Sequence, residues 1–449
     1  MVTRLSWLKR IALFFGLALL AACTSRSSPN QTDGLQCGQG QPACNTISGY
    51  SGNSIAGGIN GATIAGGGQV GAPNRVNGNF GTVGGGGGNT AGEGSTVAGG
   101  SSNTALYFHA TVSGGSENLA DAEEATVGGG LKNTASNRFA TVGGGSANTA
   151  SDYNATVGGG SGNQAANQFA TVGGGTINLA DNLAAVVAGG NHNLAGGPYS
   201  SIQGGINNSA QGNTAAIGGG AGNVANGAYA VVPGGFANQA GGAYSFAAGR
   251  TAVVAANDPG SFLFSDSNNF IFPSLAPNEF AVRATGGVRF ITGINNSGSP
   301  LAGVRLSPGS GSWDNLSDSN AKAAIAPADE RQVLEQLMSI PISTWNYKSQ
   351  DPTIRHIGPM AEDFYAAFKV GQDGHYISTV DEEGVALASI QELYRIVFQK
   401  ESGMQAPPYA DSALQNQITA LERKLTFSNG MAVFSFLTAL FALWRRKKE

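Results

Sequence analysis

From Thr96 onward, the order of apolar, small and polar positions repeats every fifteen residues. In the ten complete repeats the second position is Val or Ile, and the fourth and fifth positions are both Gly. The eighth position is always Asn, and the tenth is always Ala. Irregular copies come before them, around Ser54, Thr63 and Thr82. The regular repeats begin at Thr96, Thr111, Thr126, Thr141, Thr156, Thr171, Val186, Ser201, Ala216, Val231 and, incompletely, Phe246.

A fixed short period of small residues predicts a β-solenoid over residues 46–250, with one coil per repeat. We expect the Val or Ile side chain to point inward from a short strand. The Gly pair should turn a corner, because glycine adopts positive φ without steric cost. The Asn side chains should stack in a ladder whose amides bond to neighbouring coils, and the Ala should fill a tight interior.

Each coil carries little apolar bulk, since one Val and two Ala per repeat bury little surface at roughly 25 cal/mol per Å². A single thin solenoid would be marginal on this argument, and three chains could share a core, so we expect a homotrimer. The array resembles the β-roll heads of trimeric autotransporter adhesins, which have repeats of similar length. The resemblance covers roughly residues 45–250.

The array offers no clear chemistry. Calcium-binding solenoids carry Asp in the glycine-rich turn, and these turns carry none. An ice-binding threonine ladder is disfavoured because Thr occupies the first position in only six of ten repeats. A rigid head or stalk that displays a surface fits best. Its variable positions are expected outside, where they could contact an unknown ligand or simply cover the coil, and they include Tyr107, Phe108, Phe139, Phe169, Tyr199 and Tyr229.

After Arg250 the fifteen-residue period stops, and short aromatic strands alternate with turn residues. We interpret residues 251–312 as a β connector that caps the solenoid. Residues 313–402 then have the composition of an ordinary α+β domain. Apolar spacing predicts a helix around Val333 to Ile340, a strand at residues 343–347, a strand turning into a helix over residues 355–364, and a longer helix around Val385 to Val397.

The junction between these two regions reads Ser317-Asp318-Ser319-Asn320-Ala321-Lys322. Together with Arg355 to Gly358, Ala361-Glu362 and the long helix, it resembles the C-terminal self-cleaving intramolecular chaperone of phage tailspikes and endosialidases. The resemblance spans about ninety residues, and Glu362 stands where the family usually has Gln. It implies that Ser317 is the nucleophile, that Lys322 is the general base, and that the scissile bond is Leu316–Ser317.

The residue chemistry supports the same roles. A serine hydroxyl needs a base to become a good nucleophile, and a lysine is a base only when it is neutral, which burial favours. A buried site formed by a trimer would therefore make cleavage wait for assembly. The alternative is that residues 317–322 are simply the polar start of a helix with Ser317 as its N-cap. We expect His356 to be a packing residue and His375 to be exposed.

The first residues predict export. A basic start, an apolar run over residues 11–20 and Leu20-Ala21-Ala22-Cys23 are similar to a bacterial lipoprotein signal, with lipidation at Cys23. An ordinary secretory signal with an incidental cysteine is the alternative. Residues 23–45 would be a polar tether, and Cys37 and Cys44 are candidates for a disulfide. Two cysteines without a nearby histidine make a poor metal site.

The last residues predict a second membrane contact. Residues 411–427 have the spacing of a short coiled coil, and residues 428–444 are apolar enough to predict a membrane helix, with a basic cytoplasmic tail at 445–449. A sorting tail that is removed after export is the alternative. The formal net charge of −4 argues against nucleic-acid binding.

The sequence therefore predicts a mainly β protein: a trimeric β-solenoid, a β connector, an α+β chaperone domain, a coiled coil and a membrane helix. We expect an exported, membrane-anchored surface protein, with the head in the outer membrane or at the cell surface and the C-terminal fragment in the inner membrane. The only enzymatic activity we expect is one self-cleavage, without cofactor or metal. The alternative function is a phage-derived tail fibre that binds a receptor. A carbohydrate-cleaving tailspike is disfavoured because the array has no acidic pair placed for that chemistry.

Overall fold

The computed structural model describes residues 34–36 and 43–402. The chain divides into two compact units, residues 1–284 and 285–449. Within the described part, the first unit is a β-solenoid and the second contains a small antiparallel sheet followed by an α+β region. The expected signal sequence, Cys23, the coiled coil and the membrane helix at 428–444 lie outside the described residues.

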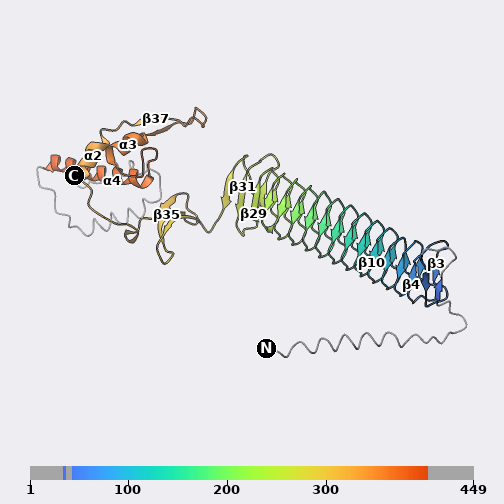
Figure 1. Cartoon of the computed structure of the whole chain (residues 1–449). Helices are drawn as coiled ribbons and strands as arrows, with labels where there is room; N and C mark the ends of the chain where they lie inside the picture. The colour runs from blue at the N-terminus through green and yellow to red at the C-terminus, as the bar shows by residue number, and fades with distance from the viewer. Residues whose placement is uncertain (1–33, 37–42, 403–449) are drawn as a thin grey trace, which may run out of the picture. The chain divides into compact units, whose positions relative to one another are not determined.

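The solenoid has two parallel sheets, one strand from each in every coil (Figure 1). Each coil pairs with the coil fifteen residues later, as in Thr111 with Thr126. A third contact runs along the corner, where isolated bridges join positions such as Ser101 and Ser116. The predicted solenoid is therefore confirmed.

The strands of the first sheet come from the first two positions of each repeat and from the ends of the array. They are β1 Gly34–Gln36, β2 Asn45–Ile47, β4 Thr63–Ile64, β6 Thr82–Val83, β8 Thr96–Val97, β10 Thr111–Val112, β12 Thr126–Val127, β14 Thr141–Val142, β16 Thr156–Val157, β18 Thr171–Val172, β20 Val186–Val187, β22 Ser201–Ile202, β24 Ala216–Ile217, β26 Val231–Val232, β27 Gly235–Phe236, β29 Phe246–Arg250, β31 Phe262–Ser265 and β33 Phe280–Arg283.

The strands of the second sheet come from the ninth and tenth positions of each repeat and from the ends of the array. They are β3 Ser54–Ile55, β5 Arg75–Val76, β7 Thr90–Ala91, β9 Thr104–Ala105, β11 Leu119–Ala120, β13 Thr134–Ala135, β15 Thr149–Ala150, β17 Gln164–Ala165, β19 Leu179–Ala180, β21 Leu194–Ala195, β23 Ser209–Ala210, β25 Val224–Ala225, β28 Gln239–Ala240, β30 Ala252–Val254 and β32 Phe272–Pro273.

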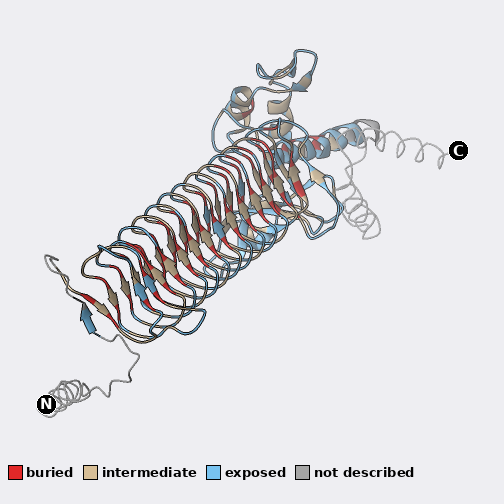
Figure 2. Cartoon of the chain, turned by 90° about the vertical axis from the view of Figure 1, so that its right-hand side faces the viewer, coloured by how far each residue is buried: buried red, intermediate tan, exposed pale blue. Residues whose placement is uncertain are grey.

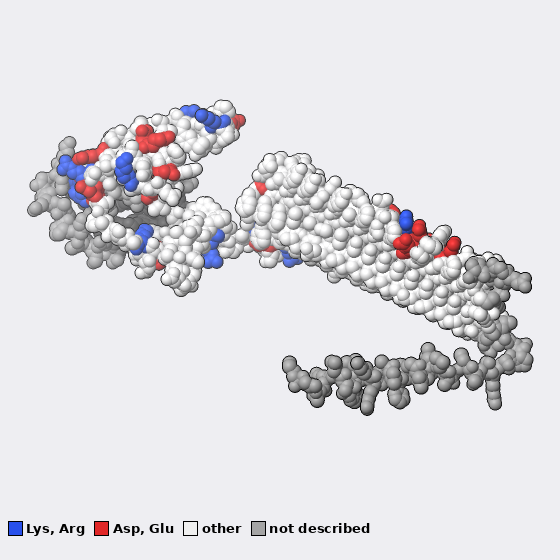
Figure 3. Space-filling model, viewed as in Figure 1, with Lys and Arg blue, Asp and Glu red and all other residues white. Residues whose placement is uncertain are grey.

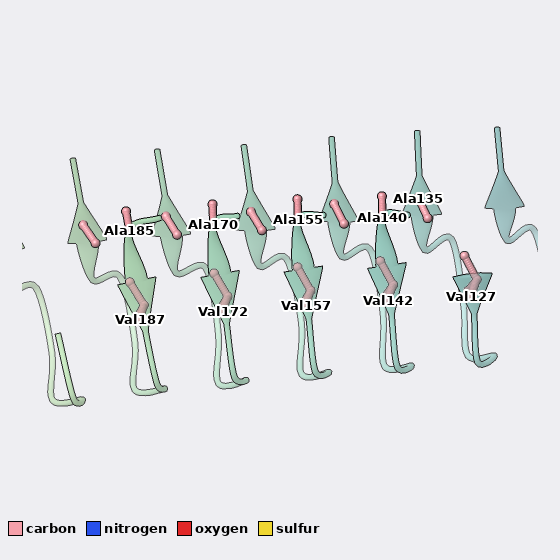
Figure 4. Close-up of a cluster of buried hydrophobic side chains, with 14 of the residues drawn as sticks. Val127, Ala135, Ala140, Val142, Ala155, Val157, Ala170, Val172, Ala185 and Val187 are labelled. Atoms are coloured by element: carbon pink, nitrogen blue, oxygen red, sulfur yellow. The ribbon is translucent and has the colours of Figure 1, made fainter. Parts of the chain in front are cut away.

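The solenoid interior is a stack of small apolar side chains. Val127, Val142 and Val157 lie above one another at intervals of one coil, beside stacked alanines (Figure 4). These side chains are fully buried within a single chain, and buried residues line the inside of every coil in Figure 2. The core therefore closes within one chain, and three chains need not share it; the homotrimer stays a prediction. Because these side chains are small, the two sheets lie close enough for the interior of each coil to be fully packed.

The asparagine ladder forms as the repeat predicts. The backbone N–H of Asn118 donates to Asn103 Oδ1 in the preceding coil at 3.0 Å. Its side-chain amide donates to the carbonyls of Gly114 at 2.9 Å and Gly130 at 2.8 Å. Each buried amide thus closes hydrogen bonds within its own coil and to both neighbours, which offsets the cost of burying a polar group.

Two expectations about the ends of the array are wrong. Ser54–Ile55 does not begin a coil, because β3 pairs with β5 in the second sheet. The coils also continue beyond Arg250, since β29 pairs with β31 and β31 with β33, both in parallel. At this end Arg283 donates to Asp266 Oδ1 at 3.0 Å and to the Asn268 carbonyl at 2.8 Å, and these bonds hold the loop that follows β31.

The surface of the solenoid is sparsely charged, and its visible side is largely uncharged in Figure 3. The aromatic side chains expected outside are exposed or half-buried, as predicted. At the other end, β1 pairs with β2 in antiparallel fashion. Cys44 is disulfide-bonded; its expected partner Cys37 lies outside the described residues, so that pairing remains a prediction.

The second unit begins with a three-stranded antiparallel sheet, β34 Val288–Ile294, β35 Pro300–Leu306 and β36 Trp313–Asn315. A 3-10 turn, η1, follows at Ser319–Ala321. The α+β region consists of α2 Glu330–Leu337, the antiparallel pair β37 Ser343–Trp345 and β38 His356–Gly358, α3 Ala361–Phe368 and α4 Thr379–Ser402. Among the helices within residues 43–402, none is long and apolar enough to span a bilayer.

Candidate functional site

The candidate site lies where the small sheet ends and the turn η1 begins. Cross-strand pairing aligns Trp313 in β36 with Leu306 in β35, and Asn315 with Val304. The next residue, Leu316, continues this pairing, because its backbone N–H donates to the Gly303 carbonyl at 3.0 Å. The residue before the expected scissile bond is thus fixed to the sheet by a backbone hydrogen bond.

The side chain of Asp314 fixes β36 to the neighbouring strand β35. Its Oδ2 accepts from Ser307 Oγ at 2.7 Å and from Arg305 Nε at 3.1 Å. The Ser307 hydrogen bond, followed by the hydrogen bond and charge of Arg305, lowers the pKa of the Asp314 carboxyl from its ordinary value. The sequence analysis missed this anchor, although an acidic residue beside a tryptophan in a short strand, with Arg305 and Ser307 nearby in the sequence, was the available signal.

Asp318 shapes the turn after Ser317. Its Oδ1 accepts from the Asn320 backbone N–H at 2.9 Å and from Asn320 Nδ2 at 3.0 Å. The Lys322 N–H donates to the Ser319 carbonyl at 3.2 Å. Asp318 therefore caps this turn, and the alternative in which Ser317 is an N-cap is wrong.

The turn brings the lysine back to the serine. Lys322 Nζ donates to Ser317 Oγ at 2.7 Å, within one chain. Both residues are exposed in the single chain, as is Leu316. The hydroxyl thus lies in hydrogen-bond contact with a potential base and directly follows the carbonyl of Leu316. This geometry suits attack by a serine on the preceding peptide bond, provided that the lysine becomes neutral.

His356 and His375, the histidines of the second unit, lie apart from this pair. The ring of His356 stacks on Trp345 with centroids 4.7 Å apart, and its Nε2 lies 2.8 Å from Gln350 Oε1. Neighbouring Arg355 donates to the Thr344 carbonyl at 2.9 Å. His356 and Arg355 thus hold β37 and β38 together. His375 is exposed, as expected.

No group of His, Cys, Asp or Glu within the described residues is arranged to hold a metal ion. The residues that come together are Leu316, Ser317, Asp318 and Lys322. None of the other candidate site residues within the described part of the chain joins them. Cys44 belongs to the solenoid end, and Cys23 and Cys37 lie outside the described residues.

Comparison with known proteins identifies the region that starts at this site. Residues 317–370 match the family model described as chaperone of endosialidase. No curated protein matches the chain. The match is shorter than the expected ninety residues and ends before α4, but it begins at Ser317 itself. The chain therefore joins an N-terminal β-solenoid to a domain of the chaperone-of-endosialidase family.

Proposed function

We propose that the C-terminal domain is an intramolecular chaperone that assembles the β-solenoid and then cuts itself away at Leu316–Ser317. The 2.7 Å contact between Lys322 Nζ and Ser317 Oγ carries this proposal. It lies at the first residue of the segment that matches the chaperone family. It is also anchored to β35 through Leu316, whose backbone N–H donates to the Gly303 carbonyl.

The reaction needs only the chain and water. The neutral Lys322 amine takes the Ser317 hydroxyl proton while Oγ attacks the Leu316 carbonyl carbon. The Leu316–Ser317 C–N bond breaks, and its nitrogen takes the proton from Lys322. The Leu316 acyl group is then an ester on Ser317. Water hydrolyses this ester, so the solenoid fragment ends in a Leu316 carboxylate and the chaperone fragment begins with the Ser317 amine.

Assembly would control this reaction by removing water from the Ser317–Lys322 pair. The Ser317–Lys322 pair is exposed in the single chain, and a lysine in water is mostly protonated and cannot accept a proton. Removing such an amine from water favours its neutral form. We therefore propose a homotrimer in which neighbouring copies cover the pair. Cleavage would then follow correct assembly and would happen once per chain.

Substitution at the two residues tests the dyad. Wild type should give two fragments, the smaller beginning at Ser317, whereas Ser317→Ala should remain intact. Lys322→Met should slow cleavage by about 10² to 10⁴, as expected for a lost general base. Lys322→Arg should be equally slow, because the arginine side chain stays protonated. Intact mass and the N-terminal sequence of the small fragment measure both outcomes, and cleavage of the Ser317→Ala chain at the same bond would exclude the mechanism.

The role of the released head is a separate proposal. We favour a surface head or stalk tethered by lipid at Cys23 and held by a C-terminal membrane helix until it is cut. The second candidate is a phage-derived, tailspike-like fibre. The observation that supports it is the combination of a solenoid with a chaperone-of-endosialidase domain in one chain. Fractionation decides between them: a lipid mass on Cys23 and head protein in the outer membrane support the first, and head protein in purified virions supports the second.

A further inference from the structure

One corner of every coil holds its backbone in the left-handed conformation. The fourteenth residue of each regular repeat has a φ between 51° and 60°, a region that most side chains disfavour. Glycine or asparagine would adopt it at the lowest cost, yet the ten positions contain one Asn and no Gly. The folding of this corner therefore does not explain which residues occupy it.

Aromatic rings stand at this corner in every second coil. We call these rings the aromatic ridge; they belong to Phe139, Phe169, Tyr199 and Tyr229, each two repeats after the last. The fourteenth positions between them carry small or polar residues. Crowding does not impose this alternation, because Tyr229 and Tyr244 stack on adjacent coils with ring centroids 5.2 Å apart. The two-coil spacing is thus a property of the ridge that packing does not require.

The ridge is exposed, and its backbone is fixed. Phe169 is 49% exposed, Tyr199 55% and Tyr229 51%, so these rings gain little from burial in return for their strained backbone. The N–H of Tyr199 donates to the Leu183 carbonyl of the preceding coil at 2.8 Å. Because neighbouring strands lie about 4.8 Å apart, rings in alternate coils are separated by roughly 9.6 Å along the regular stack of coils in Figure 1.

Past Phe139, the surroundings of the ridge are almost uncharged. Residues 167–244 contain one acidic residue, Asp181, and no Lys or Arg. Exposed amide and hydroxyl groups lie on the same corner, at Gln168, Asn213 and Thr214. This surface offers ring contacts and neutral hydrogen bonds, and it has no field that would attract a polyanion or a polycation.

We propose that the aromatic ridge binds a neutral, extended glycan of β-1,4-linked sugars. In such a chain, alternate sugars turn the same face to one side, and the two-sugar repeat has nearly the length of two coils. The C–H groups of a sugar face pack well on aromatic rings, whose faces are electron-rich. Sugar hydroxyls would bond to the amides between the rings. The proposal goes beyond self-cleavage, because every residue that it uses lies in the solenoid.

Calorimetric titration with hexasaccharides tests the ligand class. We use the full chain with Ser317→Ala, so that one species is present. The β-1,4-linked hexamer of N-acetylglucosamine or of glucose should bind, whereas the α-1,4-linked glucose hexamer should not, because its chain curves. Failure of both β-linked hexamers, or equal binding of the α-linked one, would overturn the proposal. Binding of a proline-rich peptide instead would also overturn it, since a polyproline II turn of about 9.3 Å has a similar length.

Moving one ring tests the spacing. Tyr199→Ala should weaken binding roughly tenfold, as the loss of an aromatic stacking contact does, and Tyr199→Phe should keep it. Tyr199→Ala combined with Thr214→Tyr retains the number of rings but places one of them a single coil out of step. Thr214 has the same left-handed backbone, with φ 56°, so the new ring has a comparable position. Binding that returns to the parent value in this double variant would overturn the proposal.

Comparing two ring deletions separates binding from stability. Tyr199→Gly and Tyr199→Ala both remove the ring, but only glycine relieves the left-handed strain. Tyr199→Gly should therefore unfold at a higher temperature than Tyr199→Ala, while the two variants lose affinity for the β-1,4-linked hexamer to the same extent. An affinity that follows the unfolding temperature, with Tyr199→Gly binding as the parent does, would show that the ring only supports the fold and would overturn the proposal.

Discussion

At the scale of single residues, the fifth-position glycines decide whether the coils can stack. Gly145 has φ +92°, and an added Cβ would meet the Gly160 carbonyl oxygen at 2.1 Å and Asn148 Nδ2 at 2.7 Å. Gly144, one residue earlier, has only the Gly129 oxygen at 3.9 Å near its position. The two neighbouring glycines therefore have different physical reasons to be present.

We expect Gly145→Ala to destabilise the solenoid by more than the ~1–2 kcal/mol of the left-handed conformation alone. The clash adds to that cost, because the inter-coil distance must increase. Gly144→Ala is the matched control and should cost less than about 1 kcal/mol. Thermal unfolding of the two variants measures the difference, and equal midpoints would contradict this explanation.

Repeated residues could be interpreted from sequence because each position occurs ten times with one role. The inward Val, the corner Gly and the Asn ladder were predicted on that basis and confirmed. Residues outside the repeats occur only once, so their roles could not be inferred from a recurring pattern. Ser317 was the only N-cap considered from the sequence, and the structure shows that Asp318 accepts the capping hydrogen bond of η1.

At the scale of elements, β36 leads directly to the proposed cleavage site, and Asp314 holds β36 to β35. The pKa of Asp314 lies below its ordinary value in the folded chain. The carboxylate therefore contributes stability above the unfolded value of about 3.9, and this contribution is lost as the pH falls through the folded pKa.

Amide hydrogen exchange near Leu316 should report this change. At pH 7, Asp314→Asn should exchange faster than the parent chain, because the Arg305 and Ser307 contacts to a carboxylate are weakened. After correction for intrinsic rates, the difference should shrink as the pH falls through the lowered pKa of Asp314, where the parent also loses its carboxylate. Equal protection in the two proteins at pH 7 would show that Asp314 does not anchor β36.

Element boundaries could be predicted where the period was constant. The elements of the α+β region lie close to their expected positions, although α2 ends at Leu337 and excludes Ile340. The coils after Arg250 were missed because their length changes. Phe246 pairs with Phe262 and Phe262 with Phe280, so the spacing becomes sixteen and then eighteen residues. Inserted loop residues hide the repeat from a search at fixed period.

At the scale of the whole molecule, the closed core of a single chain changes where trimer contacts are expected. The solenoid Val and Ala side chains are fully buried without a partner. By contrast, no residue from Thr285 to Asp329 is buried. The Ser317–Lys322 pair lies in this stretch, so the proposed trimer would have to cover the pair there.

The proposed dyad should remain within one chain, although we propose that its activation needs a trimer. Lys322 contacts Ser317 of the same chain, five positions earlier, across the turn η1. Trimers that combine Ser317→Ala chains with Lys322→Met chains contain no chain with both groups. Differently tagged chains, co-expressed and purified through both tags, should therefore stay intact.

Mixed trimers of wild-type and Ser317→Ala chains provide the control, in which only the wild-type chain should be cut. Cleaved Lys322→Met chains in the first mixture would mean that a neighbouring lysine reaches Ser317 in the assembly. The turn capped by Asp318 would then not create the reactive pair. If the chains stay intact in the first mixture and the wild-type chain is cut in the control, Ser317 and Lys322 must belong to the same chain. The trimer would then act only by covering the pair.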